Sequence, residues 1–224
     1  MNAARPRRIF KELIRMLLLA ACAYGSLDRA LPEGFRNIVY ATPGARFIYL
    51  TNISLYLTIA SVVLGYAIRA LKTTSAHICL LYKDMLAVSF SIEGVVTSMF
   101  WTLCAINPML LRSKALLSKE RSISLTTDIC QHLLPFVLLL VEQTGTVLVK
   151  RRGCMYAIFA LGTIYLAGIW LYSAVYGVWA YPIFRKSSTV GRILLVSIGC
   201  MLGGMFYTCL VKINRFMHKI SLLK

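Results

Sequence analysis

Residues 124–143, SLTTDICQHLLPFVLLLVEQ, form an apolar stretch that is long enough to cross a bilayer. About 20 residues are needed, because a helix rises about 1.5 Å per residue across a hydrocarbon core of about 30 Å. The first half of the stretch nevertheless carries Asp128, Gln131 and His132, and Pro135 follows. Asp128 and His132 share one helix face at their spacing of four residues. Because Pro135 has no amide hydrogen, we expect a kink and a free carbonyl on Gln131.

The ionisable residues of this stretch have two interpretations. Each costs at least about 2.5 kcal/mol inside an apolar span, so such residues often mark a functional site. Alternatively, Thr127 or Asp128 caps the start of the helix, and His132 is hydrogen-bonded inside a bundle. The stretch by itself is compatible with both interpretations.

The composition is that of an integral membrane protein. Of the 224 residues 58% are hydrophobic, which is too high for a soluble domain, and we expect one membrane domain over residues 1–224. Lys and Arg number 25 against 8 Asp and Glu, a net charge of +17. These basic residues lie in short clusters between apolar segments. The pattern indicates orientation signals and contact with anionic lipid headgroups, and it argues against nucleic acid as a partner.

The sequence predicts neither a metal site nor a bound cofactor. The seven cysteines include no CxxC pair, and there are only three histidines, of which two lie in basic flanking segments. A disulfide framework, a zinc site and a multi-histidine centre are therefore not expected.

The apolar pattern predicts an all-α bundle of about six transmembrane helices. The first segment is short, contains Arg15 and has a basic start like that of a signal peptide, but we expect it to be retained. Six spans place both termini on one side, and a slight excess of Lys and Arg there favours the cytoplasm. The expected spans are 13–27, 47–71, 85–106, 124–142, 155–178 and 190–211.

Two of these spans carry further polar residues. Glu93 lies near the middle of the third span, where a carboxylate is expected to be neutral or paired. It either closes a structural hydrogen-bond network or lines the same cavity as His132. In the second span, small and mildly polar residues recur every three or four positions, which favours close helix packing along one face. These residues are Thr51, Ser54, Thr58, Ser61 and Gly65.

The second and fourth spans enter the membrane from the same face. Thr51 and His132 then differ in depth by about 6 Å, and Asp128 is level with Thr51. A hydroxyl, an imidazole and a carboxylate are the parts of an activated nucleophile. Matching depth does not establish that the three side chains are neighbours.

Several short motifs, in this order, resemble the androgen-induced-gene family of the FAR-17a type. The resemblance runs from about Tyr49 to Asn214. Its motifs are Tyr49-Leu-Thr-Asn52, Asp84-Met-Leu-Ala-Val88, Phe100-Trp101, Leu134-Pro135-Phe136 with Glu142, Gly177-Val-Trp-Ala-Tyr-Pro182 and Gly191-Arg-Ile193.

This resemblance implies a six-span fold and a threonine hydrolase. Animal members of the family cleave fatty acid esters of hydroxy fatty acids, and their nucleophile corresponds to Thr51. Their histidine lies five residues before the proline, where this chain has Cys130, whereas His132 lies three residues before Pro135. Either this branch places the histidine differently, or the helix shifts register near Pro135, or hydrolysis is lost.

We therefore expect a membrane-embedded lipid ester hydrolase, in the endoplasmic reticulum or another internal membrane. In this hypothesis Thr51 is the nucleophile, His132 is the base and Asp128 orients the imidazole, while Cys130 and Glu93 are further candidates. The alternative is a non-catalytic lipid-binding or transport protein, in which Glu93, Asp128 and His132 form a polar relay.

Overall fold

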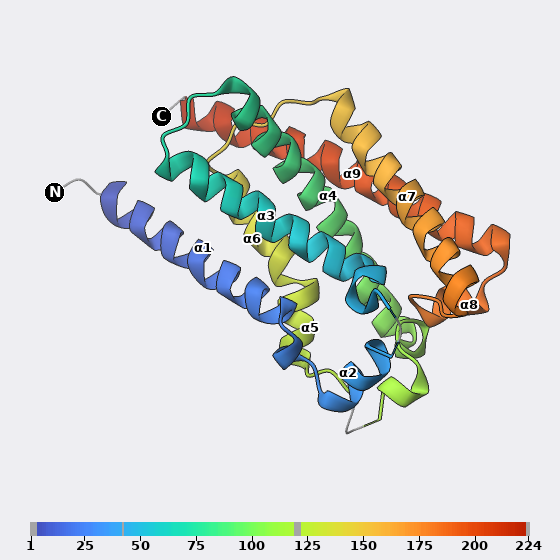
Figure 1. Cartoon of the computed structure of the whole chain (residues 1–224). Coiled ribbons are helices and arrows are strands. Elements are labelled where there is room, and N and C mark those ends of the chain that lie inside the picture. The colour runs from blue at the N-terminus through green and yellow to red at the C-terminus, as the bar shows by residue number, and fades with distance from the viewer. Residues whose placement is uncertain (1–3, 42, 119–121, 223–224) are drawn as a thin grey trace.

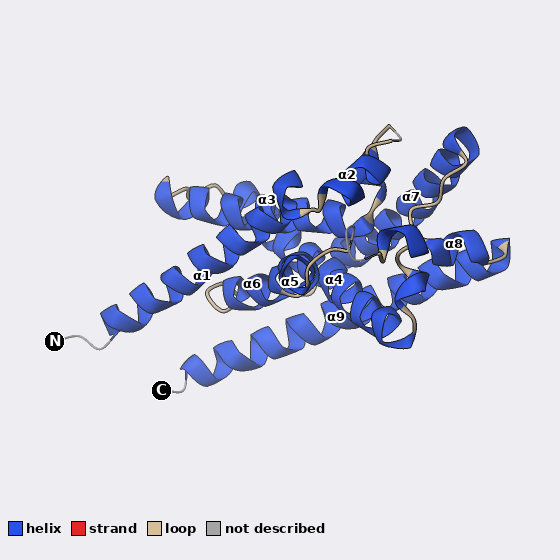
Figure 2. Ribbon diagram, turned by 90° about the horizontal axis from the view of Figure 1, so that it is seen from below, coloured by secondary structure: helices blue, strands red, loops and turns tan. Residues whose placement is uncertain are grey.

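The computed structural model describes residues 4–41, 43–118 and 122–222, and all regular structure in these residues is helical (Figure 1). The helices pack side by side, and both termini lie at the same end of the bundle (Figure 2). The elements are α1 (Ala4–Ser26), η1 (Asp28–Ala30), α2 (Glu33–Val39), η2 (Ala45–Ile48), α3 (Leu50–Ala70), α4 (Ala76–Ile106), η3 (Pro108–Leu110), η4 (Lys114–Leu116), α5 (Leu125–His132), α6 (Leu134–Gln143), α7 (Arg152–Tyr176), α8 (Pro182–Lys186) and α9 (Thr189–Leu222).

The predicted all-α membrane bundle is confirmed. In the described part of the chain, five helical segments are long and apolar enough to cross a membrane, namely α3, α4, α5 with α6, α7 and α9. The expected first span is the helix α1, which is not among these five and which packs along α3, α5 and α6. The chain is therefore an integral multi-pass membrane protein.

Three helices extend well beyond the spans that the hydropathy predicts, and one of them is α1, which begins at Ala4 rather than at residue 13. Helix α4 begins at Ala76 rather than at residue 85, and α9 continues to Leu222 rather than to residue 211. Hydropathy detects only the part of a helix that lies in hydrocarbon, whereas backbone hydrogen bonding continues into polar turns at either end.

Helix α4 lies at the centre of the bundle, in contact with α3, α5, α6, α7 and α9. The stripe of small residues on α3 faces it, and the hydroxyl groups of Ser61 and Ser89 lie 2.8 Å apart between the two helices. On the other side, a Cβ atom at Gly203 of α9 would lie only 2.9 Å from Ile158 of α7. Small residues thus allow these helices to approach closely.

The fourth span is divided into two helices. Helix α5 ends at His132, and Leu133 leaves the helical conformation with φ −123° and ψ −51°. Pro135 lies in the first turn of α6, where its missing amide hydrogen removes no hydrogen bond. The predicted kink is thus a break between two helices, and Ser124 is the N-cap of α5.

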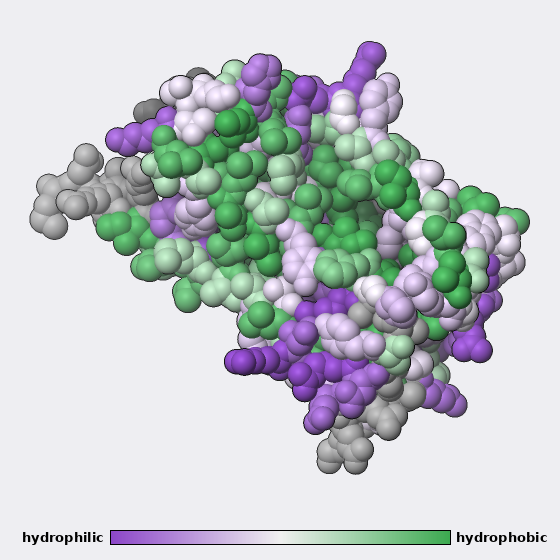
Figure 3. All heavy atoms as spheres, viewed as in Figure 1, coloured by the Kyte–Doolittle hydropathy of each residue, from purple (hydrophilic) through white to green (hydrophobic). Residues whose placement is uncertain are grey.

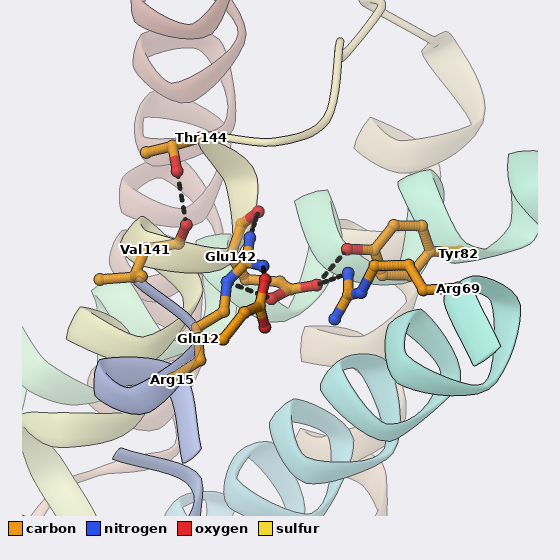
Figure 4. A network of polar contacts seen from close by, with 7 residues as sticks. All are labelled: Glu12, Arg15, Arg69, Tyr82, Val141, Glu142 and Thr144. Carbon is orange, nitrogen blue, oxygen red and sulfur yellow. Dashed lines mark hydrogen bonds and ion pairs between the residues drawn. The ribbon is translucent and has the colours of Figure 1, made fainter. Parts of the chain in front are cut away.

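A buried carboxylate at the other end of this span joins four helices (Figure 4). Glu142 of α6 is fully buried, and its Oε2 lies 3.0 Å from Nε of Arg15 in α1. Its Oε1 lies 2.8 Å from Arg69 of α3 and accepts a 2.5 Å hydrogen bond from Tyr82 of α4. A Cβ atom at Gly65 would lie 2.8 Å from this carboxylate, so glycine makes room for the cluster. The pairing with Glu142 explains how a buried arginine is accommodated in α1.

The surface has the polarity expected of a membrane-embedded bundle. On the face seen in Figure 3, hydrophobic residues cover the middle of the bundle, and hydrophilic residues gather at the end that holds α2 and α5. Helices α7 and α9 expose large apolar side chains such as Ile164, Leu171, Leu194 and Met201. These side chains face the surroundings of the bundle, where lipid stabilises them.

We predict that Glu142→Ala lowers the free energy of unfolding by about 3 kcal/mol, because it leaves Arg15 buried without its main partner. The double variant Arg15→Leu with Glu142→Leu should recover part of this loss, since no charge then remains unpaired between α1 and α6. Thermal unfolding in detergent measures both changes. The matched control is Glu12→Gln, which removes the more exposed partner of Arg15 and should cost less than about 1 kcal/mol. A Glu142→Ala protein as stable as this control would contradict the prediction.

Candidate functional site

A cavity of about 870 Å³ lies at the end of the bundle opposite to the two termini. Its walls come from α2, the start of α3, the ends of α4 and α5, the η3–η4 segment and residues 177–186. Thr51 and His132 both line this cavity. The structure therefore places the hydroxyl and the imidazole, which the sequence puts at similar depth, in the wall of one cavity.

Thr51 lies in the first turn of α3. Tyr49 precedes this helix in an extended conformation, and no helical carbonyl accepts the first amide hydrogens, those of Leu50 and Thr51. The phenol oxygen of Tyr181 faces these two amides and the Thr51 hydroxyl. The threonine side chain thus lies at a helix N-terminus, where partial positive charge gathers.

Tyr181 is a component of the site that the sequence analysis names only as part of the motif Gly177-Val-Trp-Ala-Tyr-Pro182. Burial raises the pKa of Tyr181, and hydrogen bonds from Thr51 offset part of this rise. Its ring packs edge-on against Tyr49, with centroids 5.5 Å apart. Tyr181 is therefore a neutral phenol that can donate a hydrogen bond at physiological pH. Its 130-residue separation from Thr51 hides this proximity in the sequence.

A second, smaller cavity of about 140 Å³ adjoins the first. The two share four lining residues, and the rest of the smaller cavity is formed mainly by apolar side chains of α4, α7 and α9. Thr51 consequently lies where a polar cavity meets an apolar slot. Such a junction suits a molecule with a polar head and a hydrocarbon chain. The shared residues are Thr51, Phe100, Leu111 and Tyr181.

His132 is the last residue of α5 and is held by stacking. Its ring lies parallel to that of Phe100, with a centroid distance of 3.4 Å and an interplanar angle of 8°. Its Nδ1 is buried and has no hydrogen-bond partner among the described residues. An imidazole that is fixed in orientation and has an unpaired nitrogen can accept a proton from a bound molecule.

Asp128 is engaged chiefly with Arg112. Both carboxylate oxygens pair with the guanidinium group of Arg112, and Oδ1 lies 4.0 Å from Nε2 of His132. That distance is longer than a hydrogen bond. Arg112 also lies 5.6 Å from the centre of the Phe100 ring, so this ring is flanked by the arginine and the histidine. Asp128 is therefore connected to His132 indirectly, through its ion pair with Arg112 and the Phe100 ring that stacks on the imidazole.

Cys130 lies on a different side of α5 and does not line the cavity. Its backbone and Cβ pack against Gly25 of α1, where a Cβ atom would lie only 3.1 Å from the Cys130 carbonyl oxygen. The neighbouring Gln131 donates a 2.7 Å hydrogen bond to the Gly25 carbonyl. Cys130 thus contributes to the contact between α5 and α1.

Glu93 belongs to a separate polar cluster between α3 and α4. It is fully buried and accepts a 3.1 Å hydrogen bond from Thr58, while its second oxygen has no partner in the described part of the chain. Arg112, not Glu93, is the charged side chain that pairs with Asp128, and it lies over the Phe100 ring that stacks on His132. The geometry gives no link between Glu93 and the two other residues of the suggested relay.

A search of the described residues for metal-binding clusters finds no group of three or more His, Cys, Asp or Glu side chains. The polar side chains that line the larger cavity include a hydroxyl, an imidazole, phenols and basic groups.

We predict that Glu93→Ala lowers the free energy of unfolding by about 1–3 kcal/mol, because it leaves the buried Thr58 hydroxyl without its partner. Glu93→Gln keeps an acceptor for that hydroxyl and should be milder. Chemical denaturation in detergent compares the two variants. A Glu93→Ala protein with the wild-type midpoint would mean that the cluster contributes nothing to stability.

Comparison with known protein families is consistent with this architecture. The family model described as FAR-17a/AIG1-like protein matches residues 13–215, which is most of the chain. Searches of curated proteins and of solved structures gave no significant match. The match extends from α1 to near the end of α9 and includes every residue of the cavity described above. The chain therefore belongs to the FAR-17a/AIG1-like family of membrane proteins.

Proposed function

We propose that this protein hydrolyses long-chain fatty acid esters within the membrane, with fatty acid esters of hydroxy fatty acids as the substrate class. The observation that carries the proposal is that Thr51 and His132 line one cavity, and that an apolar slot begins at Thr51. The slot accommodates the part of the acyl chain next to the ester, and the larger cavity accommodates the ester and the alcohol part. Family membership supports the same substrate class.

In the first step, Oγ of Thr51 forms a bond to the acyl carbonyl carbon, and its proton passes to the imidazole of His132. The bond between the carbonyl carbon and the alcohol oxygen then breaks. The departing alkoxide takes the proton from the imidazolium and leaves as an alcohol. The product on the protein is an acyl ester of Thr51.

In the second step, water attacks the acyl carbonyl and gives a proton to His132. The fatty acid leaves, and Thr51 regains its proton from the imidazolium. Water reaches the site through the polar cavity, which lies at the end of the bundle rather than at its centre.

The tetrahedral intermediate carries negative charge on the former carbonyl oxygen. The first amide hydrogens of α3, which face the Tyr181 oxygen, and the neutral phenol of Tyr181 lie beside Thr51 and can turn to this charge in the transition state. Stacking on Phe100 holds the imidazole of His132, and Asp128 acts on it across 4.0 Å. Asp128 and Arg112 together set the electrostatic environment of the base.

The substrate enters from the surrounding lipid, in the endoplasmic reticulum or another internal membrane. Basic residues at the two ends of the bundle contact anionic headgroups. No cofactor takes part in the mechanism, and nucleic acid is not a partner.

The central prediction concerns the pair Thr51 and His132. Thr51→Ala and His132→Ala should each lower the rate of ester cleavage by about 100-fold or more, because a threonine hydroxyl is a poor nucleophile without a base. The double variant should be no worse than either single variant, since the two groups act as one unit. Purified protein in detergent, assayed with a palmitoyl ester of hydroxystearic acid, gives the rates.

The matched control is Cys130→Ala, which should stay close to the wild-type rate because Cys130 packs against α1. A severe Cys130→Ala defect with a mild His132→Ala defect would assign the role of the base to Cys130, which occupies the position of the histidine in the animal family members. That result would refute the pairing of Thr51 with His132. A fluorophosphonate probe that labels the wild type but not Thr51→Ala would identify the nucleophile directly. Absence of cleavage, together with lipid flux across vesicles, would instead support the transport alternative.

A further prediction concerns Tyr181. Tyr181→Phe should lower kcat by about tenfold or more with little change in KM, because its hydroxyl acts on charge that develops only in the transition state. Tyr172→Phe is the matched control, since the Tyr172 hydroxyl bonds to the carbonyl of Pro43 in an exposed position. Equal kinetics for the two variants would remove Tyr181 from the mechanism.

A further inference from the structure

The larger cavity is strongly basic. Its lining includes five basic residues and, within the described part of the chain, no aspartate or glutamate. The cavity that holds Thr51 and His132 therefore has a positive potential, focused by apolar walls. The basic residues are Arg46, Arg112, Lys114, Arg185 and Lys186.

Two of these five basic residues, Arg46 and Arg112, form ion pairs with carboxylates that do not line the cavity. Arg46 lies 2.8 Å from Asp28, and it also donates to the carbonyls of Ser26 and Leu27. Arg112 is held by both oxygens of Asp128. These two arginines have structural partners and do not need a ligand.

The other three make no ion pair with any described residue. Lys114 begins the short helix η4, and Arg185 and Lys186 lie in the last turn of α8. All three side chains are exposed. Helix α8 contacts η3, which ends four residues before Lys114, and all three side chains line the same cavity. The excess positive charge of the cavity comes from this group of three.

The position of these three cations relative to Thr51 suits an amphiphilic ligand. Tyr181, which faces Thr51, precedes helix α8, and Arg185 lies four residues further along. Four residues of helix correspond to a rise of about 6 Å. The cations are thus displaced from Thr51 within the polar cavity, whereas the apolar slot adjoins Thr51 among α4, α7 and α9.

We propose that Lys114, Arg185 and Lys186 form a subsite that binds the anionic head group of the substrate, a carboxylate or a phosphate, while its ester lies at Thr51. The inference rests on the proposed function for the position of the ester. It goes beyond that function by assigning the residues that select an acidic substrate over a neutral one. The competing explanation, attraction of the protein to anionic membrane lipid, is an outcome of the test below.

The test compares one ester in two charge states. The substrates are the palmitoyl ester of hydroxystearic acid and the methyl ester of the same compound, both in neutral phosphatidylcholine nanodiscs. The test variant carries Lys114→Gln, Arg185→Gln and Lys186→Gln. The matched control carries Lys150→Gln, Arg152→Gln and Lys212→Gln, which remove the same charge from exposed positions at the opposite end of the bundle.

We expect the test variant to lose about tenfold in kcat/KM for the free acid, equivalent to about 1.4 kcal/mol, and to keep its kcat/KM for the methyl ester. The control variant should match the wild type on both substrates. Raising the salt concentration should weaken the wild-type preference for the acid, because ions screen the exposed cations. An equal loss on both substrates, or no loss on either, would overturn the subsite. The same loss in the control variant would assign the effect to overall charge.

A binding experiment separates this inference from the proposed function. Thr51→Ala protein, with and without the three glutamine substitutions, is titrated with a fluorescent palmitate, a fluorescent lysophosphatidate and a neutral fluorescent monoacylglycerol. Selective loss of palmitate or lysophosphatidate binding supports the subsite and identifies the preferred anion, even if the wild type cleaves no ester. Binding of all three probes that is unaffected by the substitutions would overturn the subsite, even if ester cleavage is confirmed.

Discussion

The missing amide hydrogen of Pro135 divides the fourth span into two helices, and the arrangement at both ends of the bundle follows from this division. Helix α5 ends at His132, three residues before Pro135. The histidine is thereby presented at a helix terminus, against Phe100 and inside the polar cavity. Helix α6 carries Glu142 to the opposite end, where it meets Arg15 and Arg69.

At both ends of the bundle, ion pairs between buried side chains determine which helices lie together. At the end with the termini, Glu142 compensates a buried arginine and so attaches α1, whose sequence is too polar to qualify as an apolar span. At the other end, Asp128 compensates Arg112. Desolvated charges are costly without partners, so each pair fixes which helices become neighbours. Small residues such as Gly65 then permit the close approach that these pairs require.

The site occupies a boundary between two environments. Thr51 has an apolar slot on one side and a basic, polar cavity on the other, and it lies in the first turn of α3. A lipid ester has the same division between hydrocarbon and polar group. This correspondence of polarity connects the fold to lipid chemistry, and membership of the FAR-17a/AIG1-like family agrees with it.

Local properties of the chain determined the membrane bundle, because apolar length and the chemistry of proline act within a few residues. They also predicted that Thr51 and His132 enter from one face, since helix direction fixes depth. Lateral neighbours depend on how helices rotate and pack, which no local pattern encodes. Only the tertiary structure therefore decided that Asp128 is held by Arg112, that Cys130 faces α1, that Glu93 lies apart, and that Tyr181 meets Thr51. The same reason explains the basic cavity. Lys114 and Arg185 are 71 residues apart in the sequence, and they line one cavity because the segments that carry them lie at the same end of the bundle.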